Sequence, residues 1–154
     1  MPEYILANSQ LEYEAAQLLF NEYAQWLNID LCFQNFDKEL QQLSIMYAAT
    51  SGGIVLCKKN NDFIGCSAIR KIDTTSCELK RMWVQLPYQK LGIGETLLKE
   101  CIALAKKLNY KEILLDTLKR LQPAIKLYKK YNFIETEAYY KNPNNDVVYM
   151  KLVL

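Results

Sequence analysis

A short glycine-containing segment, Gln89–Gly94, constrains the fold of this chain more than any other feature. It follows the apolar run Met82–Val84, which predicts a strand, and it precedes an unbroken amphipathic pattern, which predicts a helix. A strand-to-helix turn of small residues leaves several backbone N–H groups free at the helix N-terminus. The helix dipole adds roughly half a positive charge at the same point. The sequence therefore predicts an α/β unit whose loop binds a phosphate group.

Hydrophobic periodicity along the rest of the chain predicts one α/β domain that spans residues 1–154. The strand before the glycine loop, the helix after it and the next apolar run form a β-α-β unit, whose crossover should be right-handed. The other strands favour antiparallel hairpins. Strands are expected at 4–7, 54–58, 63–71, 77–84, 112–116, 133–134 and 147–154, and helices at about 9–26, 36–47, 93–108 and 123–131.

Polar residues before two of these helices are expected to act as N-caps. Asn8 or Ser9 should cap the first helix and Asp37 the second, and Asn109 should end the helix after the glycine loop in a left-handed conformation. The apolar stripe of the first helix is expected to contain Leu11, Ala15, Leu18, Leu19, Tyr23 and Trp26.

Composition excludes several classes of function. The chain has 154 residues, 51% of them hydrophobic, and a formal charge of +2, which gives no basis for binding nucleic acid or an anionic membrane. No apolar run approaches the ~20 residues of a membrane helix. The N-terminal residues lack the pattern of a signal peptide. Five scattered cysteines without a C-x-x-C pair are typical of a reducing compartment, so we expect a cytoplasmic protein.

The chain contains no histidine, and this excludes more chemistry than any other compositional fact. Ser-His-Asp and Cys-His machinery and histidine-based zinc sites are ruled out, and we expect no metal site. A general base must then be a carboxylate, a tyrosine, a cysteine, a lysine or water.

The glycine loop does not match two common phosphate-binding motifs. It lacks the G-K-[ST] of a nucleoside-triphosphate loop. Leu97 stands where the dinucleotide fingerprint has its third glycine. The surrounding segments must therefore identify the ligand.

Four segments in the right order resemble the GNAT superfamily of acyl-CoA-dependent N-acetyltransferases. The loop matches the pyrophosphate motif [QR]-x-x-G-x-[GA]. Residues 78–84 and 114–117 look like the fourth and fifth strands of the family, and 124–133 resembles its A-x-x-L-Y-x-x-x-G-F signature. Two positions depart from the pattern: Asn132 replaces the usual glycine, and Leu121 stands where many members carry an asparagine.

The resemblance implies a mixed, mostly antiparallel twisted sheet of six to seven strands with flanking helices, splayed between the fourth and fifth strands. It also implies acetyl-CoA as acyl donor. Main-chain groups of the fourth strand would pair with the pantetheine arm, and amides of the loop would bind the pyrophosphate. The Lys90 ammonium group would either pair with a phosphate or only be solvated at the surface. The implied coenzyme-binding residues are Met82, Trp83, Val84, Gln89, Lys90, Leu91, Gly92, Ile93, Gly94, Glu95, Thr117 and Tyr128.

Two residues are the candidates for proton transfer. Tyr128 occupies the signature tyrosine of the family and is the expected general acid for the thiolate of coenzyme A, unless it is only a core aromatic residue. Glu78 lies eleven residues before Gln89, a spacing shared with members that use a fourth-strand glutamate as base. The alternatives are that water is the base and that Glu78 pairs with Arg70, Lys71 or Lys80. A backbone N–H near Met82–Val84 is expected to stabilise the oxyanion, and an acyl-cysteine route is disfavoured.

By analogy with the family, a primary amine acceptor would enter between residues 28–37 and 139–145. Asp30 and Asp37 would attract a cationic amine, and four aromatic side chains would form the walls: Phe33, Phe36, Tyr139 and Tyr140. The acceptor is either a small molecule or a peptide, and the protein is expected to be a monomer or a homodimer. A non-catalytic acyl-CoA-binding module is the main alternative, and a nucleotide-binding regulator is a weaker one.

Overall fold

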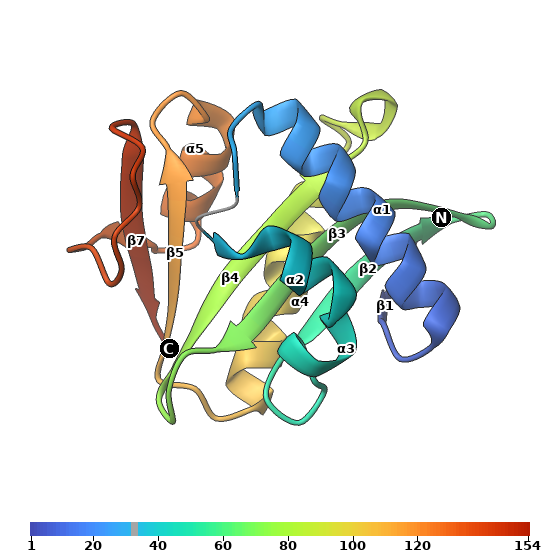
Figure 1. Ribbon diagram of the computed structural model, residues 1–154, viewed down its shortest axis with the longest axis horizontal. Coiled ribbons are helices and arrows are strands. Elements are labelled where there is room, and N and C mark those ends of the chain that lie inside the picture. Colours follow the sequence, from blue (N-terminus) through green and yellow to red (C-terminus); the bar gives the residue numbers. More distant parts are fainter. Residues whose placement is uncertain (32–33) are drawn as a thin grey trace.

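A computed structural model describes residues 1–31 and 34–154 of the chain. One twisted sheet runs through the molecule, with helices on both of its faces (Figure 1). Its strands are β1 (Glu3–Leu6), β2 (Gly53–Lys59), β3 (Asp62–Lys71), β4 (Ser76–Val84), β5 (Glu112–Leu118), β6 (Ile134–Glu135) and β7 (Val147–Val153). The helices are α1 (Gln10–Leu27), α2 (Phe36–Gln41), α3 (Leu43–Met46), α4 (Ile93–Lys107), α5 (Gln122–Lys130) and the short 3₁₀ helix η2 (Leu86–Tyr88).

The sheet has seven strands in the order β1-β2-β3-β4-β5-β7-β6. All neighbours are antiparallel except β4 and β5, which are joined by the crossover through α4. The final strand, β7, inserts between β5 and β6. This arrangement confirms the mixed, mostly antiparallel sheet predicted from the sequence.

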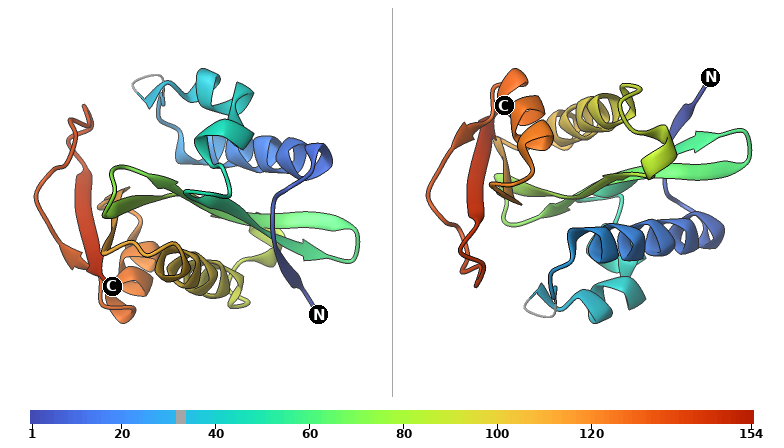
Figure 2. Two further views of the ribbon diagram at one scale, coloured as in Figure 1. Left: turned by 90° about the horizontal axis from the view of Figure 1, so that it is seen from below. Right: turned by 90° about the horizontal axis from the view of Figure 1, so that it is seen from above.

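The helices form two layers, which Figure 2 shows edge-on: α1, α2 and α3 cover one face of the sheet, and α4 and α5 cover the other. Each face has its own apolar core. The predicted stripe of α1 was partly wrong, because Leu11 and Leu18 are each 68% exposed. The helix instead buries Ala16 and Phe20, whose small and large side chains fit the sheet surface. None of the helices in the described residues is long and apolar enough to cross a bilayer.

Three predictions about helix ends can be checked. Ser9 caps α1 by accepting a hydrogen bond from the Glu12 N–H, as expected. Asn109 adopts a left-handed conformation after α4, also as expected. The prediction for Asp37 was wrong, because Asn35 precedes α2 and Asp37 lies within its first turn. Gln42 leaves helical geometry and divides the expected second helix into α2 and α3.

The sheet opens between its two parallel strands. β4 and β5 pair only from Ser76 to Glu78 and from Glu112 to Leu114, after which the strands diverge (Figure 1). β5 continues to pair with β7 as far as Leu118, and β4 with β3 as far as Val84. The facing edges of both strands therefore present unpaired backbone groups to the gap, as predicted.

Candidate active site

The glycine loop connects the end of β4 to the start of α4. Gly92 is the N-cap residue of α4 at φ 84°, a conformation that favours glycine, and a Cβ there would meet nothing within 4 Å. Lys90 also has a positive φ, of 64°. The side chain of Gln89 donates a hydrogen bond of 2.8 Å to the carbonyl of Val84, so it fastens the loop to the strand. The loop leaves the first N–H groups of α4 available to a ligand.

A groove of about 460 Å³, here called the loop groove, lies beside these N–H groups. Ten of the twelve predicted coenzyme-binding residues line it. The other two do not: Leu91 is 66% exposed, and Ile93 is buried in the core beneath α4. Glu95 is tied to α5 by Lys130 and Tyr131, each at 2.6 Å. Sequence reasoning missed the contributions of Tyr23, Trp26 and Arg120, because nothing local indicates that α1 and the segment after β5 reach this groove.

The loop groove leads into a narrow cavity of about 50 Å³ between the diverging halves of β4 and β5, here called the strand-gap cavity. Tyr23, Met82, Thr117, Leu121 and Tyr128 line both spaces. The strand-gap cavity therefore adjoins the loop groove.

A β-bulge in β4 shapes this cavity. Arg81 has φ 61°, and the pairing with β3 shifts between Cys66 and Ala68. The bulge places Lys80 and Arg81 on the same face of the sheet, whereas consecutive strand residues normally alternate. Met82 then packs with the α4 face. Two adjacent charged residues inside an apolar strand were the sequence signal for this bulge, and the sequence analysis did not use it.

The bulge is held by a buried ion pair with α2. Arg81 donates from Nε and Nη2 to the two carboxylate oxygens of Glu39, each at 3.0 Å, and the Tyr47 hydroxyl donates to the same carboxylate. Glu39 is fully buried. Burial raises its pKa, but the hydrogen bonds and charge of Arg81 outweigh this, so the pKa lies below the ordinary glutamate value. Removing either partner would leave an unpaired buried charge.

Tyr128 lies on α5 and lines both the strand-gap cavity and the loop groove. Its hydroxyl makes no hydrogen bond to another described residue, although the residue is only 7% exposed. Burial, followed by the nearby Tyr23 and Asp116, raises the pKa of Tyr128 above that of a free phenol. Tyr128 therefore keeps its proton at neutral pH. Its ring also packs on Phe133, so the core role considered from the sequence and a role in the cavity coexist.

Glu78 lies on the paired half of β4 and is 2% exposed. Arg70 Nε donates to it at 3.0 Å, Lys80 Nζ lies at 3.7 Å, and the Tyr139 hydroxyl also donates to it. The carboxylate therefore makes two of the ion pairs considered from the sequence. It does not line the strand-gap cavity, so the structure does not bring it into one space with Tyr128.

Asp116 is a second carboxylate at the site, and the sequence analysis assigned it no role in chemistry. It lies on the diverging half of β5 and lines the strand-gap cavity with Tyr128. Tyr140 and Asn142 donate hydrogen bonds to its Oδ2 atom. Its position directly after a buried apolar strand run could have indicated a site residue.

A third space, here called the charged groove, has a volume of about 620 Å³. It is lined by residues of α2, β3 and β4 and by Tyr139 and Tyr140, and its charged members are Lys38, Glu39, Arg70, Lys71, Glu78 and Lys80. Gln34 and Lys80 line both this groove and the strand-gap cavity. The charged groove thus also adjoins the strand-gap cavity, and it shares no described residue with the loop groove.

The predicted acceptor residues divide between this groove and other places. Tyr139 and Tyr140 line the charged groove, whereas Phe36 is buried against the guanidinium of Arg81. Asp30 and Asp37 line neither the charged groove nor the strand-gap cavity. Phe33 lies outside the described residues.

The four described cysteines are buried and unpaired. Burial raises the pKa of Cys77 and of Cys101 to about 12. A thiol with so high a pKa is a poor nucleophile at neutral pH. Cys32 lies outside the described residues.

The model of the acetyltransferase (GNAT) family matches residues 15–133, which include the strand gap, the glycine loop and α5. The chain belongs to this family. A curated relative, an uncharacterized N-acetyltransferase of Schizosaccharomyces pombe, is 38% identical over 138 residues, which cover 88% of this chain and 85% of that protein.

Solved GNAT structures share the fold of this family member. An acetyltransferase from Streptococcus agalactiae superposes with a TM-score of 0.82 at 21% identity, covering 99% of this chain and 98% of the other. A GNAT family acetyltransferase from Elizabethkingia anophelis, solved with acetyl-CoA bound, has a TM-score of 0.68 at 25% identity and the same coverage. The family therefore agrees with the resemblance stated from the sequence.

Proposed function

We propose that this protein transfers the acetyl group of acetyl-CoA to a primary amine by direct attack while both substrates are bound. One observation carries the proposal: the strand-gap cavity shares five lining residues with the loop groove and two with the charged groove. A donor and an acceptor entering from the two grooves would bring their reactive ends together in the cavity. The Elizabethkingia relative, solved with acetyl-CoA bound, supports the choice of donor.

The loop groove has the features that coenzyme A requires. The N–H groups at the start of α4 would bind the pyrophosphate, and the open conformation of Gly92 allows it to approach the backbone closely. The unpaired edge of β4 at Met82–Val84 would pair with the amides of the pantetheine arm, because no strand occupies that side. Thr117 and Tyr128 would flank the thioester end.

Transfer needs a neutral amine, a stabilised oxyanion and a proton for the leaving thiolate. The amine nitrogen attacks the thioester carbon, a C–N bond forms, and the C–S bond breaks. A backbone N–H of the bulged segment of β4 would stabilise the oxyanion. Tyr128 would donate its phenolic proton to the coenzyme A thiolate, and the raised pKa of Tyr128 keeps that proton in place at neutral pH until the thiolate leaves.

The proton released by the amine requires a base, and Glu78 remains our proposal, acting directly or through water. Glu78 lines the charged groove and not the strand-gap cavity, which favours the route through water. Asp116 is the alternative carboxylate, because it lines the cavity itself.

The test is thiol release from acetyl-CoA across a panel of primary amines, with coenzyme A binding measured in parallel by calorimetry. We expect binding together with amine-dependent turnover. Binding without turnover on any amine would support the alternative of a non-catalytic acyl-CoA-binding module. Tighter binding of ATP or NAD than of coenzyme A would support a nucleotide-binding regulator. The cytoplasmic location and the monomeric or homodimeric state stay predictions.

A further inference from the structure

Two carboxylates in the charged groove are already neutralised by arginines. Glu39 is bound in a bidentate pair by Arg81, and Glu78 by Arg70 at 3.0 Å. Three lysines then carry the excess charge of the groove: Lys38, Lys71 and Lys80. The whole chain carries a formal charge of only +2, so this positive charge is a local feature of the groove.

Lys80 lies where the charged groove meets the strand-gap cavity. Its side chain is 5% exposed, and its ammonium group contacts Gln34 Oε1 at 3.3 Å and Glu78 at 3.7 Å. A lysine ammonium has three donors, and these two contacts are both long. Burial, followed by the charge of Arg81, lowers the pKa of Lys80 to about 8. A buried cation in this position is stabilised when a ligand supplies an anion.

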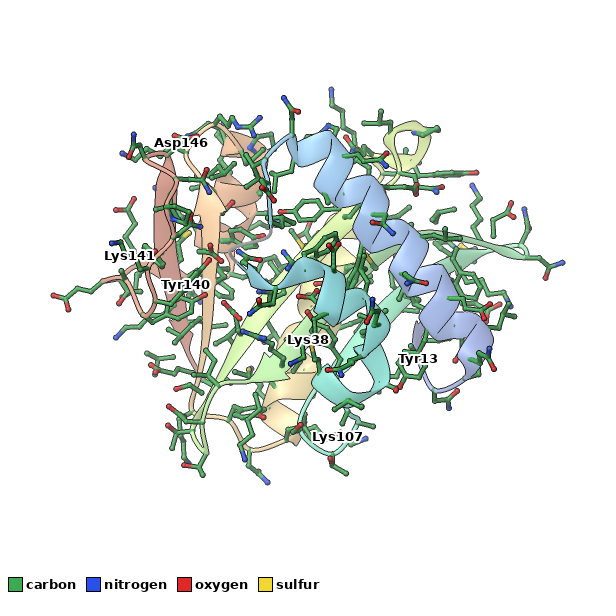
Figure 3. All side chains as sticks on the ribbon, in the orientation of Figure 1. Tyr13, Lys38, Lys107, Tyr140, Lys141 and Asp146 are labelled. Carbon is green, nitrogen blue, oxygen red and sulfur yellow. The ribbon has the colours of Figure 1, made fainter. Side chains whose placement is uncertain are left out.

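Lys38 and Lys71 are exposed and line the same groove farther from the cavity. Figure 3 shows Lys38 on α2 and Tyr140 beside β5, with β4 between them in this view. The groove therefore has cations along its length and at its inner end, while its aromatic residues come from the segment before β7. Such a surface repels a diamine and attracts an anion.

We propose that the acceptor is a primary amine that also carries an anionic oxyacid group, a carboxylate or a phosphate, which Lys80 and the neighbouring lysines of the charged groove bind. This inference rests on the proposed function and names the substrate class of the same site. The same cations also lower the pKa of an incoming ammonium group, and so help to produce the neutral amine that attacks the thioester.

The first experiment compares acceptors that carry the same amine with and without an anionic group, using kcat/KM from thiol release at saturating acetyl-CoA, expressed per neutral amine. One pair is 2-aminoethyl phosphate against ethanolamine, a second is phenylalanine against phenylalaninamide, and 1,4-diaminobutane is the cationic probe. We expect at least a tenfold preference for the anionic member of one pair, and the pair that shows it identifies phosphate or carboxylate. Equal or better use of the neutral or cationic amines would overturn the proposal.

The second experiment tests whether the lysines of the charged groove cause any preference for anionic acceptors. Lys80→Met should remove most of it, and Lys71→Gln should reduce it severalfold, while the KM for acetyl-CoA stays unchanged in both variants. Lys107→Gln is the matched control, because Lys107 is an exposed lysine at the end of α4 (Figure 3). Unfolding midpoints would verify that Lys80→Met is folded. A preference that survives the Lys71→Gln/Lys80→Met double variant contradicts the proposal.

A third measurement separates failure of this inference from failure of the proposed function. If no amine supports turnover, 2-aminoethyl phosphate and phenylalanine are titrated calorimetrically into the protein saturated with coenzyme A, beside their neutral partners. Binding of an anionic amine that is weakened at least tenfold by Lys80→Met supports the groove assignment even without catalysis. Equal binding of charged and neutral members rejects it.

Discussion

The loop groove and the charged groove both adjoin the strand-gap cavity, but they differ in the kind of group that they offer to a ligand. The loop groove relies on backbone groups: a glycine cap, the first turn of α4 and an unpaired strand edge. The charged groove relies on side chains from α2, β3 and β4, which a buried ion pair between Glu39 and Arg81 holds together. From this difference we expect coenzyme binding in the loop groove to depend mainly on backbone conformation, and ligand binding in the charged groove to depend on individual charges.

The largest effect is expected at the buried ion pair. Glu39→Leu leaves the Arg81 guanidinium unpaired in the interior, and we expect it to lower the free energy of unfolding by about 3–5 kcal/mol. Urea unfolding would measure this. A loss below about 1 kcal/mol would mean that the pair does not hold the charged half of the site.

The control is the Glu39→Leu/Arg81→Met double variant, which removes both charges and should recover much of the loss in the free energy of unfolding.

The Glu39–Arg81 ion pair also predicts how the stability of the protein changes in acid. Because the pKa of Glu39 is lowered in the folded state, its contribution is present above the unfolded pKa of about 4.3 and is lost as the pH falls through the lower folded value. The double variant should lack this part of the acid sensitivity.

The next largest effect concerns the cavity between the two grooves. Tyr128→Phe removes the proposed proton donor, and we expect kcat to fall about 10²-fold with the KM for acetyl-CoA unchanged. Steady-state kinetics would show this. Tyr13→Phe is the matched control, because Tyr13 lies on α1 (Figure 3) and lines none of the three described spaces. Full turnover in Tyr128→Phe would leave Tyr128 with a structural role only.

A substitution of Glu78, the proposed base, tests which space supplies the group that accepts the proton of the amine. Glu78→Gln should lower kcat by about tenfold or more, and high pH should not restore the lost rate, because the variant cannot accept the proton. A pH profile of kcat would reveal this. Asp116→Asn serves as the comparison. If Asp116→Asn, rather than Glu78→Gln, loses kcat in a way that high pH does not restore, then the base is Asp116 in the strand-gap cavity and not Glu78 in the charged groove.

A smaller effect is expected in the backbone of the glycine loop. Gly92→Ala should cost about 1–2 kcal/mol of stability, because alanine is strained at positive φ although its Cβ meets no atom. Gly94→Ala is the control, and we expect it not to lower stability. A Cβ added there makes only an ordinary contact of 3.9 Å with Val84, and alanine favours a helix. Thermal unfolding of both variants would decide. Equal effects would show that the conformation of Gly92 is not what the loop requires.

The smallest effect is expected for a charged side chain on the loop side. Lys90 is exposed, so Lys90→Ala should raise the Kd for coenzyme A by no more than about threefold, less at high salt. Calorimetry at two ionic strengths would measure it. A tenfold loss would indicate that the loop groove, like the charged groove, depends on side-chain charge.

The elements that sequence patterns could predict are those made by neighbouring residues. The glycine loop, α4 and the strands on either side follow from periodicity and small residues, and they carried the resemblance to the family. The α1 stripe was only partly right, with Leu19 buried and Leu11 and Leu18 exposed, because three-dimensional packing, not spacing alone, selects the face that is buried. The cap at Asp37 failed because Asn35 turns the chain two residues earlier.

The sequence by itself determined the fold, the glycine loop before α4 and the absence of histidine chemistry, because each depends on local spacing or on composition. Only the tertiary structure decided that Arg81 pairs with Glu39, which lies 42 residues away, that Lys80 is buried, and that both grooves adjoin the strand-gap cavity. A charge acquires its partner and its degree of burial when distant segments pack together, and no local pattern encodes that packing.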